Sequence, residues 1–342
     1  MQGGSLECYK AQLVAKGFHQ LANLDYGQTY NPVVKPTTIQ VVLPLAYSTG
    51  WAMRQIDIQN AFLHGTLFEE VYMTQPSGFS HLLYPFHVCR LNKAIYSLEQ
   101  APRAWFSRLS SCLLQLGFHA SKADSSLFIF HARSTTIFIL IYVDDIIVTS
   151  LVLTTIDELL ALLQNDFAVK DLGDVNFFLS IELQRLPEGL LLSLLQYILD
   201  LLRTTKMLEA KPISSPMASS HSPSAYDSDP FPDTTLFRST IGSPQYLSLT
   251  RPNLAFAVNR VCQFMHRPTK LHWQAVKCIL RYLKHTLSHR LLITKSLTQH
   301  LEAFFDADWV GCLDGCRSTS AYCIFLGKKL ISWSSRKHPT VS

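Results

Sequence analysis

The chain has 342 residues, of which 48% are hydrophobic and 16% are charged, with a formal net charge of +5. This composition predicts a globular chain with room for two or three domains and excludes an intrinsically disordered protein. The longest apolar runs are shorter than the roughly 20 residues of a membrane-spanning helix, so we expect no membrane partner. The modest positive charge permits nucleic-acid binding without predicting it.

Strand-like and helix-like segments alternate from about residue 9 to residue 217, which predicts mixed α and β structure. Leu13-Val14-Ala15 is typical of the end of a strand, and Pro102 precedes a segment with apolar residues at helical spacing. The predicted elements are, in chain order, a helix over 37–49, a strand over 53–58, a helix over 104–116, a hairpin over 135–149 with its bend at Asp144-Asp145, a helix over 156–167 and a strand pair over 177–192.

A segment rich in Ser, Pro and Asp over 216–232 is predicted to be a linker. Helices are predicted over 254–265 and 271–284, and strand-like segments follow from about residue 301. The helix over 271–284 turns apolar residues inward, including Trp273. Its neighbouring face is either a solvated surface or a contact for a phosphate backbone, because it gathers four positive side chains, Lys270, Lys277, Arg281 and Lys284.

The eight cysteines show no regular pairing, and no signal peptide opens the chain, so we expect reduced thiols in an intracellular protein. A zinc site is one alternative, because Cys262, His266, His272 and Cys278 are close in sequence. Their spacings, like that of Cys312 and Cys316, match no common zinc pattern, so a structural role is the favoured interpretation.

Two adjacent carboxylates, Asp144 and Asp145, stand between the apolar runs 137–141 and 146–148. Such a pair in a buried-looking strand costs several kcal/mol unless a cation accompanies it, and hard oxygen ligands suit Mg²⁺. A turn is the plain alternative, since Asp is common in turns. A third carboxylate, Asp57, also ends an apolar strand-like run. Three carboxylates at strand ends can converge on two metal ions about 4 Å apart, as phosphoryl transfer requires.

The motifs around these carboxylates resemble those of the reverse transcriptase of copia-type long-terminal-repeat retrotransposons. The resemblance covers nearly the whole chain, and its motifs occur in the family order. The residues that carry it are Tyr9-Lys10-Ala11, Leu13-Val14-Ala15-Lys16-Gly17-Phe18, Arg54-Gln55-Ile56-Asp57 with Asn60-Ala61-Phe62-Leu63-His64-Gly65, Gln100-Ala101-Pro102-Arg103-Ala104-Trp105, Tyr142-Val143-Asp144-Asp145, Lys170-Asp171-Leu172-Gly173-Asp174, Arg281-Tyr282-Leu283-Lys284 and Asp306-Ala307-Asp308-Trp309.

This resemblance implies an α+β right-hand polymerase fold. The implied parts are a palm with N-terminally truncated fingers over 1–215, a linker over 216–232, a helical thumb or connection over 233–298, and a partial ribonuclease H-like segment over 299–342. The palm would hold two Mg²⁺ ions, with Mn²⁺ as a substitute. Asp57 and Asp144 would be direct ligands and Asp145 a supporting carboxylate.

The same resemblance implies nucleotide contacts at Phe62, Gln100 and Lys16, with Phe62 crowding the ribose 2′ position. For Phe62, a core role is the alternative. Arg103 would contact nucleic acid, although a role at the start of its helix is equally credible. The implied partners are an RNA template, a DNA primer, deoxynucleoside triphosphates and other parts of a retrotransposon polyprotein. The implied location is a cytoplasmic virus-like particle or the nucleus.

Asp306 matches the first carboxylate of the ribonuclease H domain of this family. We expect no ribonuclease H activity, because the chain stops at Ser342, before the next carboxylate of that domain, and one carboxylate cannot hold two metal ions.

Several residues depart from the family pattern. Cys8, Gln12 and Gln40 replace usual arginines, Glu99 replaces a usual lysine, Ser97 and Ser180 replace usual glycines, and Pro244 falls in a helical stretch. Lost guanidinium groups weaken phosphate binding, and an interior proline costs about 3 kcal/mol. The departures and the missing fingers strands favour low or absent activity, so an inactive remnant with the palm fold and weak nucleic-acid binding is the alternative to an active polymerase.

Overall fold

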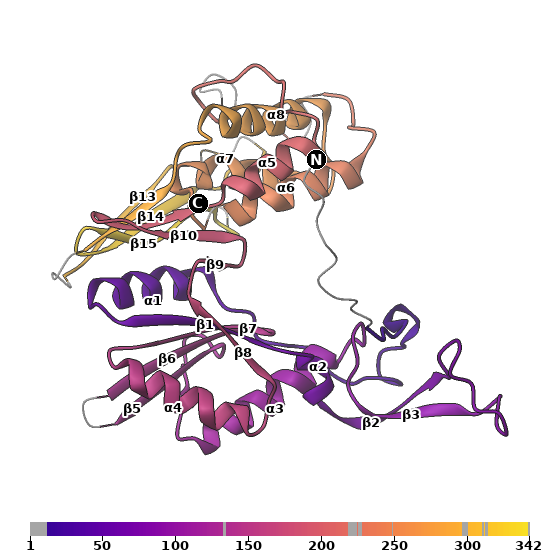
Figure 1. The fold of residues 1–342 in the computed structure, drawn as a ribbon. Helices are drawn as coiled ribbons and strands as arrows, with labels where there is room; N and C mark the ends of the chain where they lie inside the picture. Colours follow the sequence, from indigo (N-terminus) through magenta and orange to yellow (C-terminus); the bar gives the residue numbers. More distant parts are fainter. Residues whose placement is uncertain are drawn as a thin grey trace, which may run out of the picture. The chain divides into compact units, whose positions relative to one another are not determined.

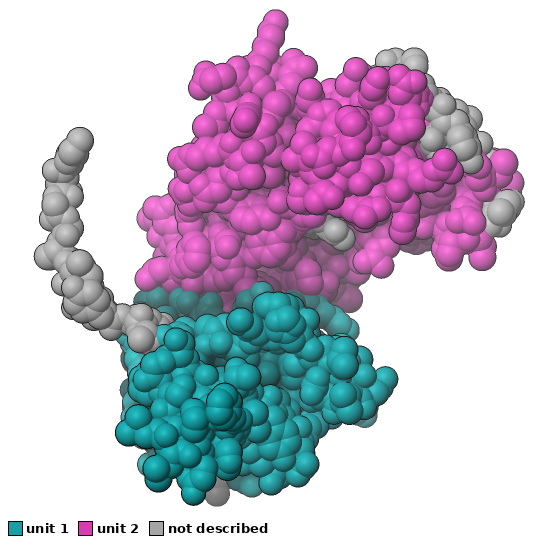
Figure 2. Space-filling view, turned by 90° about the vertical axis from the view of Figure 1, so that its right-hand side faces the viewer, with its two compact units in different colours: residues 1–35, 52–174 teal, residues 36–51, 175–342 magenta. Residues whose placement is uncertain are grey.

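The protein is described here from a computed structural model, which covers residues 12–132, 135–217, 224, 228–247, 249–295, 300–309, 311 and 314–340 (Figure 1). The chain forms two compact units, 1–35 with 52–174 and 36–51 with 175–342, coloured separately in Figure 2. The predicted boundaries at 215 and 232 stay predictions. The motif residues Cys8, Tyr9, Lys10 and Ala11, most of the predicted linker, Cys312, and the last two residues lie outside the described residues.

A six-stranded antiparallel sheet in the order β4-β5-β6-β7-β1-β8 forms the centre of the first unit (Figure 1). The helices α3 (Ala101–Gln115) and α4 (Leu153–Gln164) pack on one face of it, where their apolar side chains join those of the sheet in one core. The strands are β1 (Ala52–Ile58), β4 (His119–Ala120), β5 (Leu127–Ala132), β6 (Thr135–Tyr142), β7 (Asp145–Ser150) and β8 (Val169–Asp174).

The predicted strand over 53–58, the helix over 104–116 and the hairpin over 135–149 are confirmed, with two corrections. The hairpin bend lies one residue earlier than predicted, at Val143-Asp144, because Tyr142 pairs directly with Asp145 and leaves a two-residue loop. The helix predicted over 156–167 is α4, which starts at Leu153 and ends at Gln164.

A second, two-stranded sheet in the first unit joins β2 (Thr66–Thr74) to β3 (Val88–Lys93). It shares a small apolar core with the segment before α3, formed by Leu67, Val71, Ala94, Ile95, Leu98 and Ala101. The predicted strand end at residues 13–15 is a single parallel bridge between Val14 and Tyr96, followed by the short helix η1 (Gly17–His19). The other element of this part is α2 (Ala61–His64).

The second unit contains α1 (Pro36–Ser48), a four-stranded sheet in the order β12-β11-β10-β9, and a three-stranded sheet in the order β13-β14-β15. The helices predicted over 37–49 and 271–284 and the strand pair over 177–192 are confirmed. The other elements are β9 (Phe177–Phe178), β10 (Ile181–Arg185), β11 (Gly189–Ser193), β12 (Leu291–Thr294), β13 (Leu301–Ala307), β14 (Thr319–Leu326), β15 (Lys329–Lys337), α5 (Leu195–Thr204), α6 (Thr234–Leu247), η2 (Pro252–Leu254), α7 (Ala255–Cys262) and α8 (Lys270–His285).

Local side-chain contacts fix the start of α8 and the end of the predicted linker. Thr269 caps α8, because its hydroxyl accepts a hydrogen bond from the His272 backbone N–H and its own backbone N–H donates to Nδ1 of His272. Phe231, at the end of the predicted linker, stacks on Trp273, which is therefore half-buried rather than in the core. Within the residues that the structure covers, no helix has the length and apolar character needed to cross a membrane.

Candidate active site

Three carboxylates meet at one end of the two central strands of the first unit. The antiparallel pairing of β1 with β7 sets Asp57 directly opposite Asp145. Asp144 lies in the adjoining two-residue loop, and its carbonyl accepts a hydrogen bond from the Ile58 backbone at 3.0 Å. The structure therefore brings together the three carboxylates that the sequence analysis selected. Asp57 is far from Asp144 and Asp145 in the chain, and the pairing of β1 with β7 brings it beside them.

Asp145 is the carboxylate whose surroundings are most unusual. Burial raises the pKa of Asp145 to about 6, the negative charges of Asp144 and Asp57 add to the rise, and the Gln55 hydrogen bond opposes it. Gln55 donates from Nε2 to Oδ1 of Asp145 at 2.8 Å. Asp145 is thus destabilised in its charged form by burial and by two neighbouring carboxylates, and a hard divalent cation would relieve both costs.

No set of three or more Asp, Glu, His or Cys side chains in the described part of the chain is already gathered as a metal-ligand cluster. The fit of a cation here therefore rests on Asp57 opposite Asp145 across β1 and β7, on Asp144 in the adjoining loop, and on the raised pKa of Asp145. Carboxylate oxygens in this position match the ligands that Mg²⁺ prefers.

Two further residues face the carboxylates, although the sequence analysis gave neither of them a role in the site. Lys170 of β8 is the cross-strand partner of Asp57 on the side away from β7. The pKa of Tyr96 is raised by burial and by the charges of Asp144 and Asp57, so its hydroxyl shares their electrostatic environment. Gln55 could have been found from sequence, because it lies two positions before Asp57 and so on the same face of β1.

The loop between β6 and β7 is held by a tryptophan. Val143 has a φ of 57°, an unfavourable value for a β-branched residue. The Nε1–H of Trp105 on α3 donates to the Val143 carbonyl at 2.7 Å. The Trp105 ring is buried and packs edge-on against Phe167, with 5.4 Å between ring centroids. A rigid side chain from α3 therefore holds the strained peptide that leads into Asp144.

The residues proposed to contact nucleotide lie around this end of the first unit, in different environments. Phe62 on α2 packs against both apolar cores and meets Tyr96 edge-on at 4.9 Å between centroids. Gln100 is buried, and its amide bonds Gln20 and the Asp25 carbonyl. Lys16 is exposed beside η1, and Arg103 donates to the Gln28 carbonyl at 3.3 Å.

The positive residues of α8 and the acidic residues of β13 belong to the second unit. Lys277 is exposed, Lys284 is half-buried, and Arg281 donates from Nε to the Lys211 carbonyl at 2.6 Å. Asp306 is exposed on β13, where it bonds the backbone of its neighbour Ala307. His272, of the zinc alternative, is buried against Phe264 and uses both ring nitrogens in hydrogen bonds.

A comparison with protein families identifies the chain. Residues 5–219 match the family model described as reverse transcriptase (RNA-dependent DNA polymerase). The chain belongs to this reverse transcriptase family. The resemblance to copia-type retrotransposons is confirmed as well.

Relatives of this member of the reverse transcriptase family are retrovirus-related Pol polyproteins. The polyproteins from transposons RE2 and RE1 of Arabidopsis thaliana are each 48% identical to it over 99% of this chain and 23% of their own length. The polyprotein from transposon TNT 1-94 of Nicotiana tabacum is 35% identical over 98% of this chain and 26% of its own length. The chain thus spans about a quarter of the length of these relatives.

Several of the departures from the family pattern have structural counterparts in this chain. Ser97 and Ser180, which replace usual glycines, have φ values of 69° and 57°, a region that disfavours any residue with a Cβ. Pro244 lies inside α6, where it removes a helical hydrogen bond. Gln40, in place of an arginine, is buried and donates to the Leu249 carbonyl at 2.8 Å.

Proposed function

We propose that this chain is the RNA-directed DNA polymerase part of a copia-type retrotransposon polyprotein. It would extend a DNA primer on an RNA or DNA template, with deoxynucleoside triphosphates as substrates. The observation that carries the proposal is the register that sets Asp57 opposite Asp145, with Asp144 in the loop beside them. In this proposal the first unit holds the palm and fingers, and the helices after the predicted linker form the thumb or connection. Other parts of the polyprotein would accompany it in a virus-like particle or the nucleus.

Asp57 and Asp144 would hold two Mg²⁺ ions, with Asp145 as a supporting carboxylate and Mn²⁺ as a substitute. When bound, such ions stabilise the charge that develops on the attacking 3′-hydroxyl and the leaving pyrophosphate. Gln55 orients Asp145 through its hydrogen bond, and Trp105 holds the loop that carries Asp144. Phe62, placed against Tyr96, would exclude a ribose 2′-hydroxyl. Gln100, Lys16 and Arg103 would contact nucleotide or nucleic acid.

A second candidate is an inactive remnant with the same fold and at most weak nucleic-acid binding. The positive φ values of Ser97 and Ser180 and the proline inside α6 favour it, because each is a local cost that the family pattern avoids. Both candidates have the same three carboxylates, so only an activity measurement separates them.

Primer extension on an RNA template with Mg²⁺ tests the proposal. If the chain is an active polymerase, the unmodified chain extends the primer, extension is lost in Asp144→Asn, and it is retained in the matched variant Asp306→Asn of the second unit. A thermal melt of each sample verifies that it is folded. No extension by a well-folded unmodified chain would favour the remnant, and extension that survives Asp144→Asn would contradict the assigned site.

A further inference from the structure

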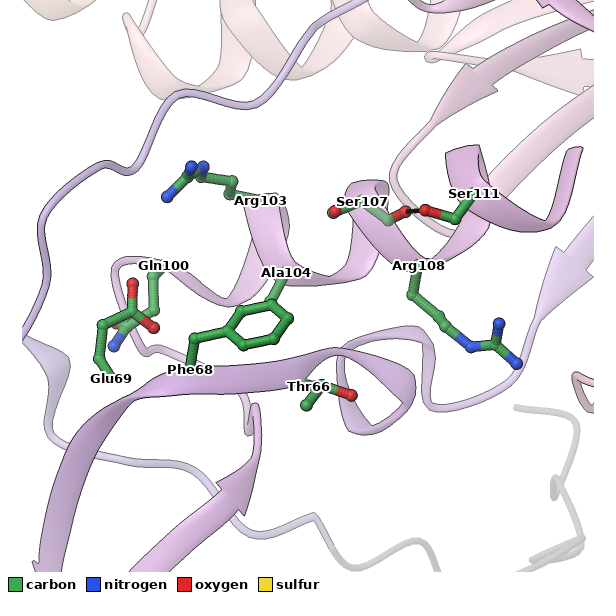
Figure 3. Close-up of a pocket in the computed structure, with 9 residues that line it drawn as sticks. All are labelled: Thr66, Phe68, Glu69, Gln100, Arg103, Ala104, Ser107, Arg108 and Ser111. Carbon is green, nitrogen blue, oxygen red and sulfur yellow. Dashed lines mark hydrogen bonds between the residues drawn. The ribbon is translucent and has the colours of Figure 1, made fainter. Parts of the chain in front are cut away.

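A pocket of about 220 Å³ lies between β2 and the first half of α3, apart from the three carboxylates (Figure 3). Two of its residues, Gln100 and Arg103, came from the sequence analysis, whereas Phe68 and Arg108 were not selected there. The full lining is Thr66, Phe68 and Glu69 from β2, and Gln100, Arg103, Ala104, Ser107, Arg108 and Ser111 from α3.

The positive charge of this pocket comes from two guanidinium groups on one helix. Arg103 gives one hydrogen bond to the Gln28 carbonyl, although a guanidinium has five N–H donors. Arg108 pairs with Asp166, whose side chain is 43% exposed, so this ion pair is open to solvent and to exchange for another anion. Guanidinium groups in such surroundings bind phosphate oxygens well.

The second feature of the pocket is an exposed aromatic ring. Leu67 points into the small core of the first unit, so the next residue of β2, Phe68, faces outward and is 92% exposed. In Figure 3 the Phe68 ring lies along the pocket beside Ala104, between Glu69 at one end and Arg108 at the other. An exposed ring beside arginines is the combination with which proteins bind unpaired nucleotides, through stacking and phosphate contact.

The remaining lining residues fit the same ligand. Glu69 disfavours an acidic peptide, because a second carboxylate would be repelled there, but it can accept hydrogen bonds from the amino group of a base. The Thr66 hydroxyl lies toward Arg108 in Figure 3. The base and the phosphate of one nucleotide would therefore meet opposite ends of the pocket.

We propose that this pocket binds an unpaired nucleotide of a single-stranded nucleic acid, with the base stacked on Phe68 and its phosphate held by Arg108. Arg103, whose guanidinium points to the other side of the pocket in Figure 3, would contact the phosphate of a neighbouring nucleotide. This inference rests on the proposed function in taking nucleic acid as the ligand, and it deepens that function by naming where the unpaired strand makes contact.

Equilibrium binding of a fluorescently labelled, unstructured RNA oligomer to the full chain tests this site without catalysis. Phe68→Ala should weaken binding roughly fivefold to 100-fold, the usual effect of removing one stacking ring. The matched control is Phe86→Ala, which removes a ring that is 96% exposed but lies outside the pocket. Equal affinities of the two variants, or no binding by the unmodified chain, would overturn the proposal.

Two further variants separate stacking from charge. In Phe68→Trp, the fluorescence of the introduced indole should be quenched when RNA or single-stranded DNA is added, since the base stacks on it. Arg108→Gln should lower the slope of log affinity against log salt by about 0.7, the share of one phosphate contact on a single strand. An unquenched indole or an unchanged slope would contradict the corresponding contact.

The two proposals can fail separately. If the unmodified chain extends no primer but its RNA binding depends on Phe68, the polymerase function fails and the pocket assignment stands. If extension depends on Asp144 while Phe68→Ala binds RNA as the unmodified chain does, the pocket assignment fails and the function stands.

Discussion

The carboxylates at the ends of β1 and β7 and those around β13 share a sequence pattern but not an environment. Asp57, Asp144 and Asp145 lie half-buried, with Tyr96 and Gln55 beside them. Asp306 and Asp308 are exposed, and Asp308 accepts hydrogen bonds from the backbones of Gly311 and Thr319. Both groups follow apolar strand-like runs in the sequence.

An aspartate at the end of a strand is therefore a weaker sign of function than the side chains and backbone groups around it. In the first group, Asp57 and Asp145 set like charges opposite each other across the sheet, and the pKa of Asp145 is raised; perturbed carboxylates of this kind are typical of functional sites. Around β13, Asp308 satisfies backbone donors of a turn, which is a structural role.

Removal of Asp57 should have the largest effect. In Asp57→Asn we expect Mn²⁺ affinity to fall about 100-fold or more, because the loss of a ligand should exceed the 10–100-fold cost of losing an outer partner. Electron paramagnetic resonance of free Mn²⁺ measures this affinity. Asp306→Asn is the control and should leave it unchanged. Equal losses in both variants would erase the contrast between the two regions.

Trp105→Phe should act on the same region through the loop. The variant leaves the Val143 carbonyl without its indole donor, so we expect a loss of about 1–3 kcal/mol in the free energy of unfolding. Mn²⁺ affinity should fall as well at a temperature where the variant is folded. Trp273→Phe removes an indole from the second unit and should leave Mn²⁺ affinity unchanged. A stability loss with unaltered Mn²⁺ affinity would assign Trp105 to the core alone.

Ser97→Gly should stabilise the chain by about 1 kcal/mol, because glycine adopts a positive φ without steric cost. Ser97→Ala keeps a Cβ and should give no such gain. Chemical denaturation measures both. A gain in the alanine variant as large as in the glycine variant would show that the hydroxyl, rather than the backbone, is the cause.

The raised pKa of Asp145 predicts a pH-dependent stability. Between about pH 4 and pH 6 the folded state binds more protons than the unfolded state, so stability falls as pH rises through this window. Asp145→Asn should remove this fall and be more stable than the unmodified chain at neutral pH, by on the order of 1 kcal/mol after solvent screening. Thermal melts at pH 3.5 and pH 7.5 measure the difference. A constant difference across both pH values would contradict the assigned titration.

Asp306→Asn should have the smallest effect, within about 0.5 kcal/mol in the free energy of unfolding, as for most exposed substitutions. Its melt in the absence of metal should overlay that of the unmodified chain. A loss above about 2 kcal/mol would mean that Asp306 supports the sheet more than its exposure indicates.

The sequence was sufficient where the signal is local. Apolar residues at helical spacing predicted α1, α3 and α8, because one face of each helix is buried. The continuous apolar runs 137–141 and 146–148 on either side of Asp144-Asp145 predicted the hairpin. The bend was placed one residue late, since nothing local favours a positive φ at Val143. That conformation follows from strand pairing on both sides and from Trp105.

The residues around the site were harder to foresee, because they arrive from distant parts of the chain. Trp105 lies 38 positions from the carbonyl it holds, and its apolar ring alone predicted only a core position. Tyr96 stands in a segment with no regular pattern before α3, so its proximity to Asp57 and Asp144 depends on tertiary packing. The roles of Phe62, Gln100 and Lys16 in nucleotide binding stay predictions.

The two-residue loop between β6 and β7 also limits how this region can change in length. Successive residues of a strand point to opposite faces, so one inserted or deleted residue here would move Asp145 to the core side and turn Ile146 outward. A substitution around the loop, by contrast, keeps the register of the strands and alters only local contacts. In a lineage where such elements decay, a shift of length at this hairpin would therefore end function sooner than many substitutions elsewhere.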